Sequence, residues 1–282
     1  MPKHYEALQR AEEERRRKVS GVESAVPAAV SFEGPVAPPT PRSKAPGFFS
    51  RLFKDRKASD VEAPNEANKR RISLLQPDSY VAEQYRSLRG RLDSLASTRT
   101  LKTIAVTSAN SGEGKSTCSV NLATVTAMSV GRNVLLIDCD LRRPKVHWTL
   151  GLQPQVGLAE VLLNQASVED AIQKLDGLSL DVLPVRSIPS NPSELLASPE
   201  MRRLIEDVAG RYDRIILDTP ACLGLPDAKS VSELCDGLVM VVRAGVTPQE
   251  EVQAALDVLD RRRVVGLVLN GSETTREQYG YY

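Results

Sequence analysis

The sequence lacks the features of a membrane-spanning chain, a disulfide-stabilised chain or a zinc-binding chain. Only four of its 282 residues are cysteines, and none shows the CxxC spacing of zinc or iron–sulfur sites. We therefore expect a reducing compartment. No apolar run approaches the roughly 18 residues that a membrane-spanning helix needs, and the N-terminus lacks the apolar core of a signal peptide. The chain is predicted to be cytoplasmic, reaching a membrane only from the cytoplasmic side.

Aromatic residues and net charge are also scarce. Aromatic side chains make up 4% of the sequence, and the formal net charge is +1. The basic excess is confined to residues 1–71, which hold 15 Lys and Arg against 10 Asp and Glu, whereas the remainder holds 22 against 26. We expect no nucleic-acid partner.

Residues 1–70 are predicted to be a largely disordered extension, because residues 19–46 are too poor in large apolar groups to offset the entropy of ordering. Residues 47–57 differ, with apolar side chains at helical spacing beside four basic ones. The apolar residues are Phe48, Phe49, Leu52 and Phe53. Such a basic amphipathic helix lies on an anionic membrane or docks into a partner. Alternatively, it packs onto the chain's own globular domain.

After residue 100, apolar runs alternate with helical patterns. The predicted strands are 101–107, 133–138, 179–184, 214–218, 237–243 and 264–270, and the predicted helices between them are 115–130, 158–173, 199–210, 227–235 and 248–262. The strand runs are nearly all apolar, as in strands covered on both faces. The pattern predicts an α/β fold, a doubly wound, mostly parallel sheet with helices on both faces. This domain is predicted to span 71–278, with an additional helix at 78–95.

A phosphate-binding loop is predicted within LKTIAVTSANSGEGKST, residues 101–117. A strand, a Gly-rich turn and a helix N-terminus together present backbone N–H groups and a helix dipole to an anion. Lys115 can reach the β- and γ-phosphates, and the Ser116 hydroxyl can bind Mg²⁺. The first glycine of the strict motif is Ala109 here. The predicted nucleotide-binding residues are Asn110, Ser111, Gly112, Glu113, Gly114, Lys115, Ser116 and Thr117.

Carboxylates follow two of the predicted strands. Asp138 and Asp140 come at the end of one strand, and Asp218 ends another. A single Asp at such a place is often a helix N-cap, but three of them in a phosphate-loop domain indicate a metal site, because Mg²⁺ prefers hard oxygen ligands. We predict that Ser116, Asp140 and Asp218 hold Mg²⁺.

Together these motifs resemble those of the bacterial tyrosine autokinases of the P-loop superfamily, which accompany capsule and exopolysaccharide synthesis. The shared motifs are Asp138-x-Asp140-x-Arg142, the strand end at 216–220, the segment 189–196, Glu83-x-x-Arg86-x-x-Arg89 and the terminal Tyr279-Gly280-Tyr281-Tyr282. The resemblance covers roughly residues 72–282. The chain departs from the family at Ser111, where Pro is frequent, and at Ala221, where a second Pro is usual.

The resemblance implies an ATP- and Mg²⁺-dependent kinase that regulates polysaccharide synthesis. Its acceptors would be Tyr279, Tyr281 and Tyr282 of a neighbouring subunit in a ring. Lys115 and Arg142 would neutralise phosphate charge, and Asp138 would orient and deprotonate the tyrosine hydroxyl. A separate membrane adaptor is the implied partner, which would recruit the chain to the inner face of the membrane.

The same resemblance assigns the helix at 78–95 to the ring interface. Its Glu83, Arg86 and Arg89 are either that interface or an ordinary solvated ladder of charge pairs. Asn270 is likewise either a reader of the adenine edge or a turn residue before Gly271.

Two other functions remain open. A partitioning or positioning ATPase would share the fold, but such proteins carry a second lysine where this chain has Asn110, and they lack the tyrosine tail. A nucleotide-gated scaffold would instead bind assembly proteins through residues 1–70.

Overall fold

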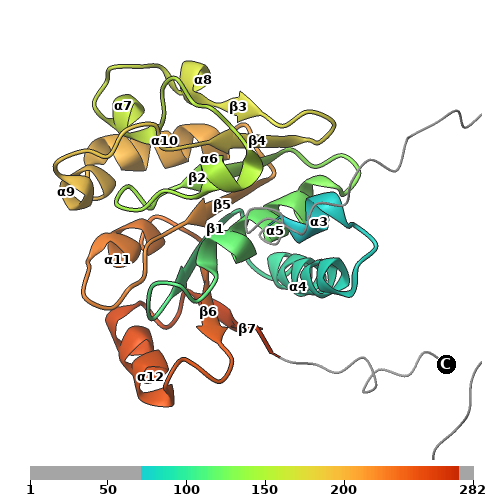
Figure 1. Cartoon of the computed structure of the whole chain (residues 1–282). Helices are drawn as coiled ribbons and strands as arrows, with labels where there is room; N and C mark the ends of the chain where they lie inside the picture. Colours follow the sequence, from blue (N-terminus) through green and yellow to red (C-terminus); the bar gives the residue numbers. More distant parts are fainter. Residues whose placement is uncertain (1–70, 273–282) are drawn as a thin grey trace, which may run out of the picture. The chain divides into compact units, whose positions relative to one another are not determined.

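The computed structural model describes residues 71–272, in which a seven-stranded sheet is wrapped by helices (Figure 1). The strands are β1 (Thr103–Ser108), β2 (Val134–Asp138), β3 (Gln173–Lys174), β4 (Leu180–Leu183), β5 (Arg214–Asp218), β6 (Gly237–Arg243) and β7 (Val264–Asn270). The predictions for residues 1–70, the segment 47–57 and the three C-terminal tyrosines lie outside the described residues.

The strand order is β3-β4-β2-β5-β1-β6-β7. Every neighbouring pair is parallel except β3 with β4, which is antiparallel. The prediction of a mostly parallel sheet is confirmed. Strands β2, β5 and β1 are consecutive neighbours, so the loops that follow them meet at one edge of the sheet.

Helices cover both faces of the sheet. They are α3 (Ile72–Leu75), α4 (Tyr80–Ala96), α5 (Lys115–Ala127), α6 (Val146–Leu150), α7 (Leu158–Leu162), α8 (Val168–Ala171), α9 (Pro192–Leu196), α10 (Pro199–Ala209), α11 (Asp227–Ser232) and α12 (Gln249–Val258). Helices α3, α4 and α5 pack on one another on one side, in cyan and green in Figure 1.

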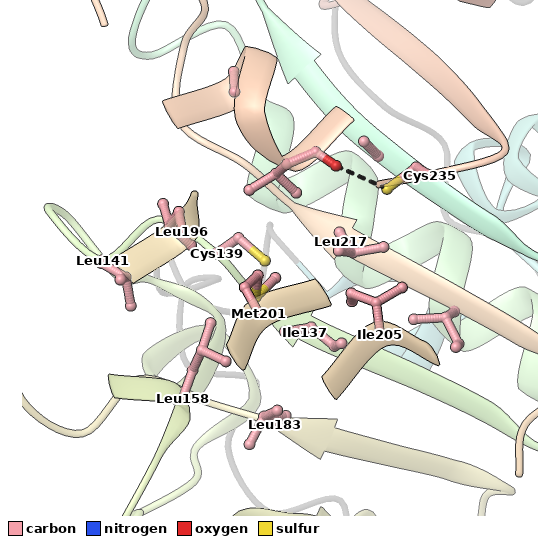
Figure 2. Packing of buried hydrophobic residues seen from close by; sticks show 14 of the residues in the cluster. Ile137, Cys139, Leu141, Leu158, Leu183, Leu196, Met201, Ile205, Leu217 and Cys235 are labelled. Atoms are coloured by element: carbon pink, nitrogen blue, oxygen red, sulfur yellow. Dashed lines mark hydrogen bonds between the residues drawn. The ribbon is translucent and has the colours of Figure 1, made fainter. Parts of the chain in front are cut away.

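Alternate residues of the central strands enter two separate cores, because side chains along a strand point to opposite faces. Leu135 and Ile137 of β2 belong to the core shared with α10, whereas Val134 and Leu136 belong to the core shared with α4 and α5. Figure 2 shows Met201 of α10 lying among the residues of the first core. Burial on both faces explains why the strand sequences are apolar throughout.

The segment predicted as one helix at 158–173 is broken, and that prediction is wrong. Asn164 has a positive φ of 57° just after α7, which ends the helix. The Ser167 hydroxyl then accepts a hydrogen bond from the Asp170 N–H at 3.1 Å and begins α8. The sequence prediction also missed α3, α6, α9 and the short strand β3.

Strand β7 is the last strand of the sheet, and one of its faces is open within residues 71–272. Leu267 and Leu269 are 54% and 61% exposed. The expectation that every strand is covered on both faces therefore fails at this edge. Within the same residues, no helix is long and apolar enough to cross a membrane.

Candidate active site

The phosphate loop joins β1 to α5. Gly114 is the N-cap of α5 and has a φ of 102°, a conformation that favours glycine. A Cβ at Gly114 would come within 2.0 Å of the Asn270 side-chain nitrogen, so any larger residue here would displace Asn270. Lys115 begins the helix and is buried. The predicted strand, glycine turn and helix N-terminus are thus present in the fold.

Contacts from distant parts of the chain brace the loop. The buried Glu113 carboxylate accepts a hydrogen bond from the Asn110 backbone N–H at 2.9 Å and another from the Thr247 hydroxyl. Asn110 donates its side-chain N–H to Glu251 of α12. Sequence reasoning missed Thr247 and Glu251, and neither residue lies in a recognisable motif.

Asn270 takes part in the same bracing. Its side-chain nitrogen donates to the Glu113 carbonyl oxygen at 2.9 Å, and Gly271 follows with a positive φ of 70°. The residue therefore ends β7, precedes a turn and holds the phosphate loop. Its reading of the adenine edge stays a prediction.

Asp138 and Asp218 are register partners on the adjacent strands β2 and β5, and both are completely buried. One Asp138 oxygen accepts from the Asp140 N–H at 3.1 Å, and the other accepts from the backbone N–H groups of Lys145 and Val146. Burial, followed by the nearby Asp218 carboxylate, raises the pKa of Asp138. Both Asp138 oxygens thus organise the loop between β2 and α6.

Asp218 is held differently. Its Oδ1 accepts from the Ser119 hydroxyl at 2.9 Å, whereas its buried Oδ2 has no hydrogen-bond partner among residues 71–272. Burial raises the pKa of Asp218 to about 6, against the opposing effects of the nearby Ser116 hydroxyl and the Lys115 cation. A buried, unpartnered carboxylate oxygen beside a hydroxyl fits a divalent cation that prefers hard oxygens.

The acidic residues alone do not form a metal cage. Among the described residues, no group of three or more His, Cys, Asp or Glu side chains is arranged to hold a metal ion. Mg²⁺ is commonly held by one or two carboxylates together with substrate phosphates. The site therefore fits a cation that arrives with a nucleotide.

Replacing Asp218 with asparagine is expected to stabilise the nucleotide-free chain above about pH 6 and to abolish its Mg²⁺-dependent binding of ADP. The folded pKa of about 6 exceeds the ordinary value of 3.8, so the wild-type chain loses stability as the pH rises through this interval and the buried carboxylate ionises. Asparagine does not ionise, so the variant escapes this loss. Thermal unfolding at about pH 4 and about pH 8 measures the difference in stability between the variant and the wild type, which should appear only at the higher pH.

The matched control for that variant is Asp207→Asn, at a carboxylate that pairs with Arg211 on the surface. Its effect on unfolding should be small at both pH values. Wild-type affinity for ADP with Mg²⁺, measured by calorimetry, should also weaken as the pH falls below about 6. A variant that is equally stabilised at both pH values would contradict the assignment.

Arg142 contacts two side chains that sequence reasoning did not predict as its partners. Its Nε donates to Asp227 at 2.7 Å and its Nη2 donates to the Ser193 hydroxyl at 2.8 Å. Asp140, two residues earlier, accepts from the Arg143 backbone N–H at 2.9 Å. Contact between Arg142 and a phosphate stays a prediction. Asp227 was missed by sequence reasoning, since an acidic residue in the first turn of a helix is common.

The charged residues of α4 make contacts within their own subunit. Glu83 and Arg86 form an ion pair one turn apart. Arg89 donates to the Val125 carbonyl at 2.7 Å, near the C-terminus of α5, where a cation is favourable. The assignment of these three residues to an oligomer interface stays a prediction.

The sequence is similar to those of several known proteins. A family model described as an AAA domain matches residues 101–257. The tyrosine-protein kinase YwqD of Bacillus subtilis is 40% identical over 214 residues, covering 75% of this chain and 90% of that protein. The succinoglycan biosynthesis transport protein ExoP of Rhizobium meliloti is 33% identical over 231 residues, covering 75% of this chain but 29% of that protein.

Among solved structures, the kinase domain of the Escherichia coli tyrosine kinase ETK superposes with a TM-score of 0.65. Its sequence is 31% identical, and the match covers 74% of this chain and 84% of that one. The similarity therefore extends over most of the residues that the structure describes.

Proposed function

Because the chain belongs to the P-loop family of bacterial protein-tyrosine kinases, we propose that it transfers the γ-phosphate of ATP to tyrosines at its own C-terminus. The observation that carries this proposal is the unpartnered Asp218 oxygen close to Ser116 and Lys115, at the end of the phosphate loop. We further propose that the chain regulates exopolysaccharide synthesis or export, since a relative carries succinoglycan biosynthesis in its name.

Phosphoryl transfer depends on positioning and charge neutralisation more than on covalent chemistry. The backbone of residues 110–117 would surround the phosphates, with Lys115 at the β- and γ-phosphates and Thr117 near the α-phosphate. Ser116, Asp140 and Asp218 would hold Mg²⁺. When bound, Mg²⁺ would neutralise phosphate charge. Glu113, braced by Thr247 and Asn110, would keep the loop in its binding conformation.

Transfer to tyrosine also requires a group that accepts the proton of the hydroxyl. Free tyrosine has a pKa near 10, so assistance from a nearby base favours attack at neutral pH. Asp138 has a raised pKa, which suits a base, but its two oxygens are engaged by backbone N–H groups. We propose that Asp138 acts as the base and that its hydrogen bonds rearrange when substrate binds.

The proposed acceptors are Tyr279, Tyr281 and Tyr282 of a neighbouring subunit. We propose a homo-oligomeric ring that brings each tail to the next active site, with a separate membrane adaptor as partner. A phosphorylated tyrosine carries almost two negative charges. A modified tail is therefore expected to be repelled by the acidic site and to loosen the ring.

One assay separates this function from its competitors. The purified full chain is incubated with ATP and Mg²⁺, and both phosphotyrosine and free phosphate are measured. Labelled tail tyrosines support the kinase. Free phosphate without phosphotyrosine supports a positioning ATPase, and neither product supports a nucleotide-gated scaffold.

Deleting residues 47–57 is expected to lower the fraction of the chain recovered with membranes. The reason is that a basic amphipathic segment gains both apolar burial and attraction to anionic lipids. Cell fractionation measures the change, with deletion of residues 24–34, which contain no basic residue, as control. Unchanged recovery would overturn membrane contact and favour packing on a protein surface.

A further inference from the structure

One buried carboxylate joins three segments that follow neighbouring strands, at the carboxyl edge of the sheet. Asp227 is the first residue of α11, which follows β5, Arg142 lies after β2, and Ser193 lies in α9 after β4. Strands β4, β2 and β5 are consecutive neighbours in the sheet. The cluster therefore connects the segments that follow three adjacent strands, at the same edge as the candidate active site.

The three side chains form hydrogen bonds with one another. Asp227 is completely buried and accepts from Arg142 Nε at 2.7 Å through one oxygen. Its other oxygen accepts from the Ser193 hydroxyl at 2.5 Å, and that hydroxyl accepts from Arg142 Nη2 at 2.8 Å. Removing one partner of such a cluster leaves a buried charge without compensation. The Arg142 Nε and Nη2 are therefore both committed to the buried Asp227 and its Ser193 neighbour.

Asp138 holds both ends of the loop that carries Asp140, and the cluster holds its middle through Arg142. Arg142 is two residues after Asp140, whereas the Asp138 carboxylate accepts the backbone N–H groups of Asp140, Lys145 and Val146. The loop between β2 and α6 is thus fixed at both ends. Asp140, one of the residues proposed to hold Mg²⁺, lies between Asp138 and Arg142 in the sequence.

We propose that Arg142 is a positioning residue, which acts through Asp227 and Ser193 to hold the Asp140 loop where Mg²⁺-nucleotide binds, and that it does not contact the phosphates. This inference rests on the proposed nucleotide site. It does not require that the chain transfers phosphate to tyrosine, because a measurement of nucleotide binding is enough to test it.

The test measures ADP binding by calorimetry, with Mg²⁺ and with EDTA, for the full chain and the variants Arg142→Met and Asp227→Asn. Both variants should weaken Mg²⁺-dependent binding by about tenfold or more, as loss of residues that orient metal ligands does. Binding in EDTA should stay within about twofold of wild type, since the phosphate loop is untouched. Because these side chains act as one unit, the double variant should bind ADP with Mg²⁺ no more weakly than the single variant with the larger loss of affinity.

If Arg142 contacts a phosphate directly, the expected result is different. Arg142→Met would then weaken ADP binding in EDTA as well, and Asp227→Asn, which frees the guanidinium, would leave binding unchanged or strengthen it. Either result overturns the proposal. If both charge variants unfold at the assay temperature, Ser193→Ala replaces them, because it keeps the ion pair, and it should show a smaller loss confined to Mg²⁺-dependent binding.

A matched pair controls for the loss of an Arg–Asp contact in general. Arg211 and Asp207 form an ion pair near the end of α10, at the opposite edge of the sheet. Arg211→Met and Asp207→Asn should leave ADP binding unchanged in both conditions. An equal loss in these variants would overturn the specific role of Arg142. Wild-type binding of ADP without phosphotyrosine formation would instead contradict the kinase proposal alone.

Discussion

Replacing Lys115 with methionine is expected to abolish phosphotyrosine on the purified chain. Methionine keeps most of the length and apolar character of the side chain but removes the cation at the start of α5. That cation is the group proposed to neutralise charge that develops on the transferring phosphoryl group. Losing one such group typically slows transfer about a hundredfold or more. Antibody detection and mass spectrometry after incubation with ATP and Mg²⁺ measure the result.

The control for this experiment is Lys174→Met, at an exposed lysine on the edge strand β3. It should leave labelling unchanged. Thermal unfolding of the Lys115 variant should be measured in parallel, so that loss of labelling is distinguished from loss of the fold. Phosphotyrosine that persists on the Lys115 variant would show that another kinase modifies the chain.

Replacing Tyr279, Tyr281 and Tyr282 together with phenylalanine is expected to remove tail labelling while catalysis is retained. Phenylalanine keeps the ring but lacks the hydroxyl that accepts the phosphoryl group. Labelling should fall to background, because these are the proposed acceptors. Tyr80→Phe is the control, since Tyr80 is 43% exposed on α4 and lies outside the tail. It should leave labelling unchanged.

The same two variants together test transfer between subunits. The triple phenylalanine variant has an intact active site, and the Lys115→Met variant has an intact tail. When they are mixed with ATP and Mg²⁺, the Lys115→Met chain should become labelled on its tail, which a size difference between the two chains reveals. Labelling of the wild-type chain without labelling in the mixture would contradict transfer between subunits.

Much of the sheet could be predicted because its signals are local. Each central strand is an apolar run of five to seven residues, and burial on both faces removes the polar alternation that marks an exposed strand. The helix predicted at 78–95 begins after Ser79, whose hydroxyl accepts the Ala82 N–H at 3.2 Å. The helix predicted at 158–173 failed because a left-handed Asn164 interrupts the pattern.

The sequence by itself determined the phosphate loop and the two acidic strand ends. The phosphate loop depends on backbone conformation, and the acidic residues depend on the edge at which parallel strands end. Both of these follow from short segments of sequence. Lys115 and Asp218 therefore lie near each other in the structure, as the alternation of strands and helices predicted.

Only the tertiary structure decided what these residues contact. Arg142 reaches Asp227 across 85 positions of the chain, and Glu113 reaches Thr247 across 134. Such contacts depend on which strands are neighbours and on where each side chain points after packing, and neither is encoded in local spacing. The physical reason is that a buried charge must find a partner wherever the fold supplies one. That requirement paired Arg142 with Asp227, a contact that no local motif predicts.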